Sequence, residues 1–160
     1  MAKISDLKLA YQVFMKAYPY RRIDWHPGAR LKKPLCEARV AVVTTAAFFT
    51  QDQLPFDTSI RGGDYSYRVI PIDTDLGALS IAHRSDAFDH RGLESDKNLA
   101  LPLDRLKSLT ASGVLGSVAP RHFSFMGSIV APGRLIANTA PEVAQMLLKD
   151  EVDAVLLTPV

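Results

Sequence analysis

Two short runs of apolar residues constrain the fold of this chain more than any other feature of its sequence. The run Arg39–Ala46 reads RVAVVTTA and is rich in β-branched residues, and the run Asp153–Thr158 reads DAVLLT. Neither run alternates polar with apolar residues, which is typical of parallel strands that are covered on both faces. Because Asp153–Thr158 follows a helical segment that ends at Glu151, it predicts the buried closing strand of a parallel βαβ unit.

Three further strands are expected between these runs. Residues 65–70 alternate polar and apolar side chains, residues 79–83 give a weaker signal, and residues 118–130 contain the alternating stretch Arg121–Phe125.

Helices are expected in two places in the same region. One begins in the first turn after Pro102 and stops at Gly113. The other begins at the capping box Thr139-Ala-Pro-Glu142. The resulting order of β, β, β, α, β, α and β predicts a single α/β layered domain with a largely parallel sheet, of the Rossmann or flavodoxin type.

The first residues predict a separate element. Ser5 can cap a helix whose apolar residues, from Leu7 to Tyr18, follow the spacing of an amphipathic stripe, and Pro19 ends it. An irregular arm follows. We therefore expect a helix and arm over residues 1–36 and the α/β domain over residues 37–160.

Composition excludes several classes of protein. The formal net charge of +2 is too close to balance to indicate nucleic-acid binding, and no run approaches the length of a membrane span. The single cysteine, Cys36, excludes an internal disulfide and is expected to be passive. Without a signal peptide, the expected location is the cytoplasm.

The densest polar constellation directly follows a predicted strand. The sequence from His83 to His90 carries two imidazoles and two carboxylates, at His83, Asp86, Asp89 and His90. Such groups supply general acid/base catalysis or bind a divalent metal. Because the spacing matches no established metal signature, we expect catalytic residues and no metal site. The alternative is a hydrogen-bonded loop in which the carboxylates cap turns.

Two other segments carry candidate residues. Thr44 and Thr45 lie at the carboxyl end of the central strand, where hydroxyl and backbone N–H groups can meet a small anion. Arg121 can clamp a carboxylate through two hydrogen bonds, although an ion pair with an acid such as Asp104 is the alternative. His122 is a candidate catalytic residue on the opposite face of the same strand.

Six stretches of the chain form an ordered set. They are Ala38–Ala46, Asp64–Pro71, His83–His90, Asn98–Leu106, Ala119–Gly127 and Val152–Thr158. This set resembles the selenoprotein B family of the glycine, sarcosine, betaine and D-proline reductases. The resemblance implies an oligomeric reductase that cleaves a carbon–nitrogen bond of an amino-acid-like substrate with a selenol or thiol, together with other reductase subunits.

The resemblance also implies where the reactive group lies. In that family the redox residue directly follows the strand that corresponds to Asp153–Thr158. We therefore expect no cofactor in these 160 residues, and a selenocysteine or cysteine beyond Val160 that is encoded by a UGA codon read as a stop. A natural truncation at Val160, or a cut made for expression, is the alternative. The 160-residue chain is expected to be inactive as a reductase.

Residue chemistry suggests roles for the candidates in such a reaction. The groups expected to donate a proton to the leaving nitrogen are His83, Asp89 and His122. The groups expected to hold the substrate carboxylate are Thr44, Thr45 and Arg121. Two other functions remain open at this point: a non-catalytic binding or assembly subunit of an oxidoreductase complex, and a metal-dependent hydrolase built on the His83–His90 loop.

Overall fold

The structure of the chain is a computed structural model that describes residues 9–17, 28–85, 88 and 90–160. The chain divides into two compact units, Met1–Arg30 and Leu31–Val160. In the first unit, α1 (Leu9–Ala17) confirms the central part of the predicted N-terminal helix, whereas its predicted cap and end lie outside the described residues. The predicted domain boundary after residue 36 stays a prediction. No described helix is long and apolar enough to cross a membrane.

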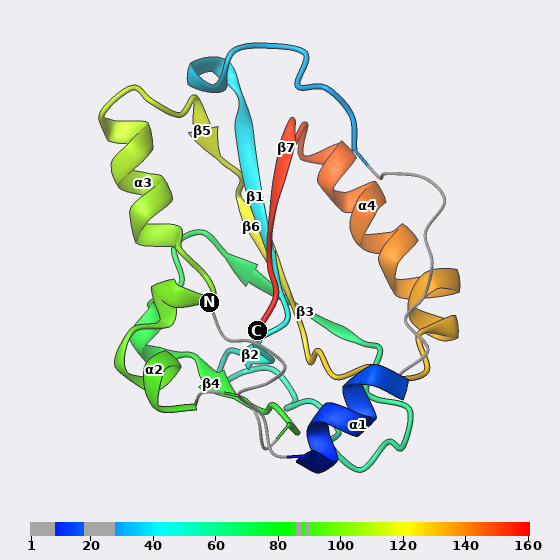
Figure 1. Cartoon of the computed structure of the whole chain (residues 1–160). Helices are drawn as coiled ribbons and strands as arrows, with labels where there is room; N and C mark the ends of the chain where they lie inside the picture. The colour runs from blue at the N-terminus through cyan, green and yellow to red at the C-terminus, as the bar shows by residue number, and fades with distance from the viewer. Residues whose placement is uncertain (1–8, 18–27, 86–87, 89) are drawn as a thin grey trace. The chain divides into compact units, whose positions relative to one another are not determined.

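The second unit is built around β1 (Arg39–Thr44), which confirms the predicted central strand. β7 (Ala154–Thr158) runs parallel to β1 on one side. On the other side, two short strands follow each other along β1, also in parallel: β5 (Ser117–Val118) pairs with its first half and β6 (Arg121–Phe125) with its second half. The predicted parallel arrangement of the two apolar runs is therefore confirmed (Figure 1).

Antiparallel pairs complete the β structure. β3 (Tyr67–Pro71) lies antiparallel to β6 at one edge of the main sheet. A separate pair is formed by β2 (Phe48–Phe49) and β4 (Ser80–Ile81). The strand expected at residues 79–83 is therefore present but shorter, as β4 alone. The fold is thus α/β with a mixed, mostly parallel sheet.

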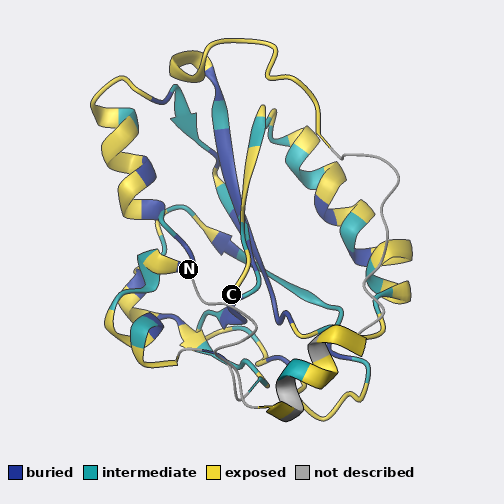
Figure 2. Ribbon diagram, viewed as in Figure 1, coloured by how far each residue is buried: buried dark blue, intermediate teal, exposed yellow. Residues whose placement is uncertain are grey.

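The two faces of the sheet pack against different helices. On one face, Val40 and Val42 join a core that includes Leu103 and Leu106 of α3 (Leu103–Ala111). On the other face, Phe123 and Phe125 pack against Val143 of α4 (Ala140–Lys149). Figure 1 shows α3 and α4 on opposite sides of the strands, and Figure 2 shows buried residues concentrated along β1.

The ends of α3 and the start of α4 can be compared with the helix-end signals predicted from the sequence. α3 begins directly after Pro102, and Gly113 follows it with a φ of 74°. By contrast, the predicted capping box at Thr139 is wrong. A π-helical turn, Leu135–Thr139, leads into α4, and the Thr139 hydroxyl donates instead to the carbonyl oxygen of Tyr65 at 2.8 Å. A short helix, α2 (His90–Ser95), precedes α3.

The prediction that the closing strand is buried is also wrong. Within the described sheet, β7 pairs only with β1 and lies at an edge. Its side chains remain accessible on both faces, and Leu157 is 68% exposed. The apolar run was correctly assigned as a strand, but its sequence does not show which neighbours cover it.

Candidate functional site

The carboxyl ends of β1, β6 and β7 meet at one edge of the sheet, which we call the carboxyl edge. In register, Thr44 of β1 lies beside Ser124 of β6 and Thr158 of β7, so three hydroxyl-bearing residues follow one another across the strands. Residues paired in this way point to the same face of a sheet. The Thr158 hydroxyl donates to the carbonyl oxygen of Ala100 at 2.6 Å, and Ser124 Oγ is buried without a partner among the described residues.

The first predicted anion-binding residue, Thr44, is fully buried. Its hydroxyl donates to the carbonyl oxygen of Thr158 at 3.3 Å and accepts from the backbone N–H of Ala46 at 3.2 Å. These bonds shape the end of β1. They leave the hydroxyl occupied, so its predicted contact with a substrate stays a prediction.

The second, Thr45, continues the pairing of β1 with β7 beyond the regular strands. Its backbone N–H donates to the carbonyl oxygen of Thr158 at 3.2 Å. Its side-chain oxygen accepts from the backbone N–H of Val160 at 3.0 Å and lies 3.4 Å from the carbonyl oxygen of the same residue. Thr45 therefore fixes the backbone of Val160 at the carboxyl edge.

His83 follows β4 and reaches the same edge. Its Nδ1 accepts a hydrogen bond from the backbone N–H of Ser85 at 3.1 Å. The proton of the neutral imidazole therefore sits on Nε2. That atom is buried and has no hydrogen-bond partner within the described part of the chain. The ring stacks on Phe88, with centroids 4.1 Å apart and planes 11° apart.

Gly127, which is separated from β6 by Met126, lies close to both Thr45 and His83. It has a φ of 68°, and a Cβ at this position would lie 2.9 Å from the carbonyl oxygen of Thr45 and 3.1 Å from Nε2 of His83. Only glycine allows the chain to pass so close to both residues. The next residue, Ser128, also has a positive φ of 49°, and such backbone strain is common at functional sites. The glycine after the alternating strand was the sequence signal for this contact, and sequence reasoning missed it.

Electrostatics hold the imidazole of His83 in its neutral form at neutral pH. Burial lowers its pKa below the ordinary value of 6.5, and the nearby His90 lowers the pKa further. His90 begins α2, and its ring meets the ring of Phe88 edge-on, with the two centroids 4.7 Å apart. The structure thus brings His83 and His90 together around Phe88. Asp86 and Asp89 lie outside the described residues.

His122, by contrast, lies inside the sheet. It is fully buried, and its Nδ1 accepts from the backbone N–H of Val42 at 3.0 Å. The reason is a gap in the pairing on this side of β1, where residues 119–122 have no register partner in β1 and Val42 therefore has no strand partner. Burial, followed by the charge of Lys107, lowers the pKa of His122 from 6.5 to about 4. The imidazole supplies a missing hydrogen bond of the sheet, and its predicted catalytic role stays a prediction.

Arg121 lies at the opposite, amino end of β6. Its guanidinium makes a two-pronged ion pair with Asp150, in which Nη2 donates to Oδ1 at 2.8 Å and Nε donates to Oδ2. The ion-pair alternative is therefore the one observed, with Asp150 in place of Asp104. Asp104 instead accepts from the side chain of Asn98 at 2.9 Å. The structure does not bring Arg121 to the carboxyl edge.

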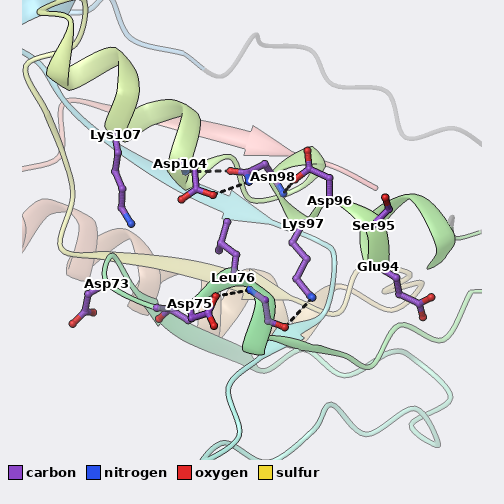
Figure 3. Close-up of a pocket in the computed structure, with 12 residues that line it drawn as sticks. Asp73, Asp75, Leu76, Glu94, Ser95, Asp96, Lys97, Asn98, Asp104 and Lys107 are labelled. Atoms are coloured by element: carbon purple, nitrogen blue, oxygen red, sulfur yellow. Dashed lines mark hydrogen bonds between the residues drawn. The ribbon is translucent and has the colours of Figure 1, made fainter.

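A surface pocket of about 460 Å³ lies elsewhere, between the β3–β4 connection and the start of α3 (Figure 3). Most of the charged side chains that line it are acidic, and the two basic ones are Lys97 and Lys107. Lys97 donates to the carbonyl oxygen of Gly77 at 3.3 Å. The side chain of Asn98 donates to the carboxylate of Asp104 and accepts from the backbone N–H of the same residue. Among the residues that the structure describes, no group of three or more potential ligands could hold a metal ion, in this pocket or at the His83 loop.

Comparison with known proteins agrees with the residue patterns. Residues 5–160 match the family described as glycine/sarcosine/betaine reductase selenoprotein B (GRDB). The chain belongs to this selenoprotein B family. It is 32% identical over 134 residues to a D-proline reductase subunit gamma of Acetoanaerobium sticklandii, an alignment that covers 84% of this chain and 52% of the relative. The predicted family resemblance is thereby confirmed.

Other members of the selenoprotein B family extend well beyond the matched segment. A glycine reductase complex component B subunit gamma of Symbiobacterium thermophilum is 27% identical, over 94% of this chain and 35% of the relative. A sarcosine reductase complex component B subunit beta of Peptoclostridium acidaminophilum is 26% identical, over 94% of this chain and 34% of the relative. The chain thus spans between a third and a half of these curated relatives. No solved structure matches the fold.

Proposed function

We propose that this chain is part of a reductase subunit that cleaves the carbon–nitrogen bond of an amino acid or a related amine by selenol or thiol chemistry. The family match over residues 5–160 supports the reaction class. The observation that carries the proposal for the site is the buried Nε2 of His83, which has no partner among the described residues and lies beside Gly127 and Thr45.

The proposed reaction needs a nucleophile that none of the described residues supplies. Cys36 is exposed and precedes β1, at the other end of the strand from Thr45. We propose that a selenocysteine or cysteine follows Val160. Its selenolate or thiolate attacks the α-carbon of the substrate, the carbon–nitrogen bond breaks with its electrons going to nitrogen, and the amine takes up a proton as it leaves.

The carboxyl edge is a suitable place for this chemistry. In open α/β sheets, ligands bind outside the carboxyl ends of the strands, where loops and not side chains of the core form the walls. Thr45 and His83 are the candidates that the structure places there with accessible surface. The finer classification of the fold as Rossmann or flavodoxin-like belongs to the same proposal, because both types carry their sites at this edge.

The direct test of the proposal reads the DNA that follows the codon of Val160. An in-frame UGA or cysteine codon, followed by an extension that brings the product to the length of the relatives, is the expected result. The full-length product should then cleave the carbon–nitrogen bond of glycine, sarcosine, betaine or D-proline with a dithiol as reductant. The first three substrates would release ammonia or an amine, whereas the ring of D-proline would open with its nitrogen retained in the product. A UAA or UAG codon directly after the Val160 codon, or a UGA codon with no open reading frame beyond it, would contradict the proposal.

An assembly role is the second candidate, and the exposed β7 edge favours it. Leu157 of β7 is 68% exposed, and apolar strand edges of this kind often pair with another chain. The relatives are named as subunits of reductase complexes, so we propose that this chain also associates with other reductase subunits. Co-purification of a tagged chain with the products of neighbouring genes, measured by native mass spectrometry, tests this.

A further inference from the structure

The point at which the backbone passes Val160 is fixed by Thr45. The backbone N–H of Val160 donates to Oγ1 of Thr45 at 3.0 Å, and the backbone N–H of Thr45 donates to the carbonyl oxygen of Thr158 at 3.2 Å. Two hydrogen bonds, one that Thr45 donates to Thr158 and one that it accepts from Val160, hold the end of the strand in register. A residue joined to Val160 therefore starts from a defined position at the carboxyl edge.

A hydrogen-bond donor without a partner among the described residues, Nε2–H of His83, lies close to Thr45. A Cβ on Gly127 would lie 3.1 Å from Nε2 of His83 and also 3.1 Å from Cβ of Thr45, so these two side chains approach the same point from different segments of the chain. The Ser85 N–H fixes the tautomer through Nδ1, and Phe88 fixes the plane of the ring. A buried N–H group without an acceptor costs about 1–3 kcal/mol, so its retention needs an explanation.

We propose that Thr45, Gly127 and His83 form a cradle for the side chain that follows Val160, in which Nε2–H of His83 donates a hydrogen bond to a thiolate or selenolate. Thr45 holds the backbone that carries this side chain, and Gly127, which has no side chain, lets the backbone after β6 pass close to both residues. The inference rests on the proposed function, because it takes the residue after Val160 to be the nucleophile.

This role differs from the one expected of His83 as an acid. A neutral imidazole is a poor proton donor to a leaving amine, but it is a fixed hydrogen-bond donor at every pH above its pKa. Hydrogen bonds to the charged form of a group favour that form. His83 then lowers the pKa of the nucleophile without exchanging a proton, and acts as a positioning residue for the reactive group.

The test uses the 160-residue chain with one cysteine appended after Val160, in a Cys36→Ser background that removes the exposed native thiol. The rate of alkylation by iodoacetamide, followed as a function of pH, gives the pKa of the appended thiol. We expect a pKa at least one unit below the ordinary value of about 8.5, that is, about tenfold more thiolate near neutral pH. The same protein unfolded in urea supplies the ordinary value.

Two variants separate the cradle from other causes. His83→Phe keeps a ring against Phe88 but removes the donor, and should return the thiol pKa to the value measured in urea. Thr45→Val keeps the shape but removes the acceptor. It should raise the thiol pKa and speed hydrogen exchange of the Val160 amide, whereas Thr45→Ser should preserve both values. If His83→Phe does not fold, Thr45→Val carries the test.

The outcomes distinguish this inference from the proposed function. An ordinary thiol pKa in the parent protein, or a lowered pKa that neither His83→Phe nor Thr45→Val changes, overturns the cradle even if the gene encodes a nucleophile after Val160. Conversely, a UAA or UAG codon directly after the Val160 codon contradicts the proposed function but leaves the measured thiol pKa unaffected.

Discussion

His83 and His122 make the same kind of hydrogen bond in two different regions of the molecule. In both, Nδ1 accepts a backbone N–H, from Ser85 and Val42 respectively, and Nε2 is buried without a partner among the described residues. Burial lowers the pKa of both side chains. The surroundings differ, because His83 stands at the carboxyl edge beside Thr45 and Gly127, whereas His122 is fully buried within the sheet.

The difference shows that position, and not the hydrogen-bonding pattern, separates a structural histidine from a candidate functional one. Between β5 and β6, the backbone N–H of Val42 in β1 has no strand partner, and Nδ1 of His122 accepts its hydrogen bond instead. The bond to His83 only shapes a turn, and its Nε2–H faces the strand ends where ligands bind in α/β proteins. We therefore expect loss of His122 to affect stability and loss of His83 to affect chemistry.

The largest effect is expected from His122→Ala. It removes a buried ring and leaves the N–H of Val42 without an acceptor, so the free energy of unfolding should fall by about 3–5 kcal/mol. His83→Ala removes a half-buried ring and should cost about 1 kcal/mol. Urea denaturation followed by circular dichroism measures both. His122→Asn, which keeps an acceptor, should recover part of the loss, and equal costs for the two alanine variants would contradict the comparison.

The second prediction concerns acid. Because the pKa of His122 is about 4 in the folded chain and 6.5 in the unfolded one, the unfolded state binds more protons between these values. The contribution of His122 to stability is therefore complete above pH 6.5 and falls as the pH drops toward 4, by about 3 kcal/mol in total. Urea denaturation at pH 7.0 and 4.5 measures this loss.

His122→Asn provides the control for the acid prediction. The variant should lose most of the pH dependence between pH 6.5 and 4.5, although the smaller contribution of His83 has the same sign and remains. Because the carboxylates with a lowered pKa, such as Asp64, start from 3.8, their contribution is lost at lower pH. A pH dependence that is unchanged in His122→Asn would show that another group titrates in this window.

The third prediction extends the comparison to the amino end of the sheet. The two-pronged ion pair between Arg121 and Asp150 is partly buried, so Arg121→Met should lower the free energy of unfolding by about 1–2 kcal/mol. Asp150→Asn should have a similar effect. In a double-mutant cycle the two losses should add to more than the loss in the double variant, and strict additivity would show that the pair contributes nothing.

The sequence predicted those parts of the fold that depend on local chemistry. The apolar runs at β1 and β7 and the Pro102 and Gly113 signals around α3 were confirmed, because strand and helix-end preferences act within a few residues. The capping box at Thr139 failed because a tertiary contact, the hydrogen bond to the Tyr65 carbonyl, competes with the local one. Such a competition between distant segments leaves no trace in a short pattern.

The candidate site was predicted less completely for the same reason. Thr45 and His83 were selected as candidates because they follow predicted strands. Gly127 was missed because its close contacts are with these two residues, which are far away in sequence. The pairing of Arg121 with Asp150, and the ladder bond of His122, follow from which strands are neighbours. Sequence patterns find chemically capable residues, and the topology then decides which of them meet.

The smallest effect is expected from Leu157→Ser at the free edge of β7. Leu157 is 68% exposed in the isolated chain, so the substitution should change the free energy of unfolding by less than about 0.5 kcal/mol. Neighbouring Val43, half-buried against α4 on the same face, serves as the control, and Val43→Ser should cost clearly more. If β7 is covered in a longer polypeptide or a complex, the cost of Leu157→Ser should rise there to about 2 kcal/mol. A large cost in the isolated chain would contradict the edge position, and an unchanged small cost in the assembled protein would show that this edge is not where the other parts bind.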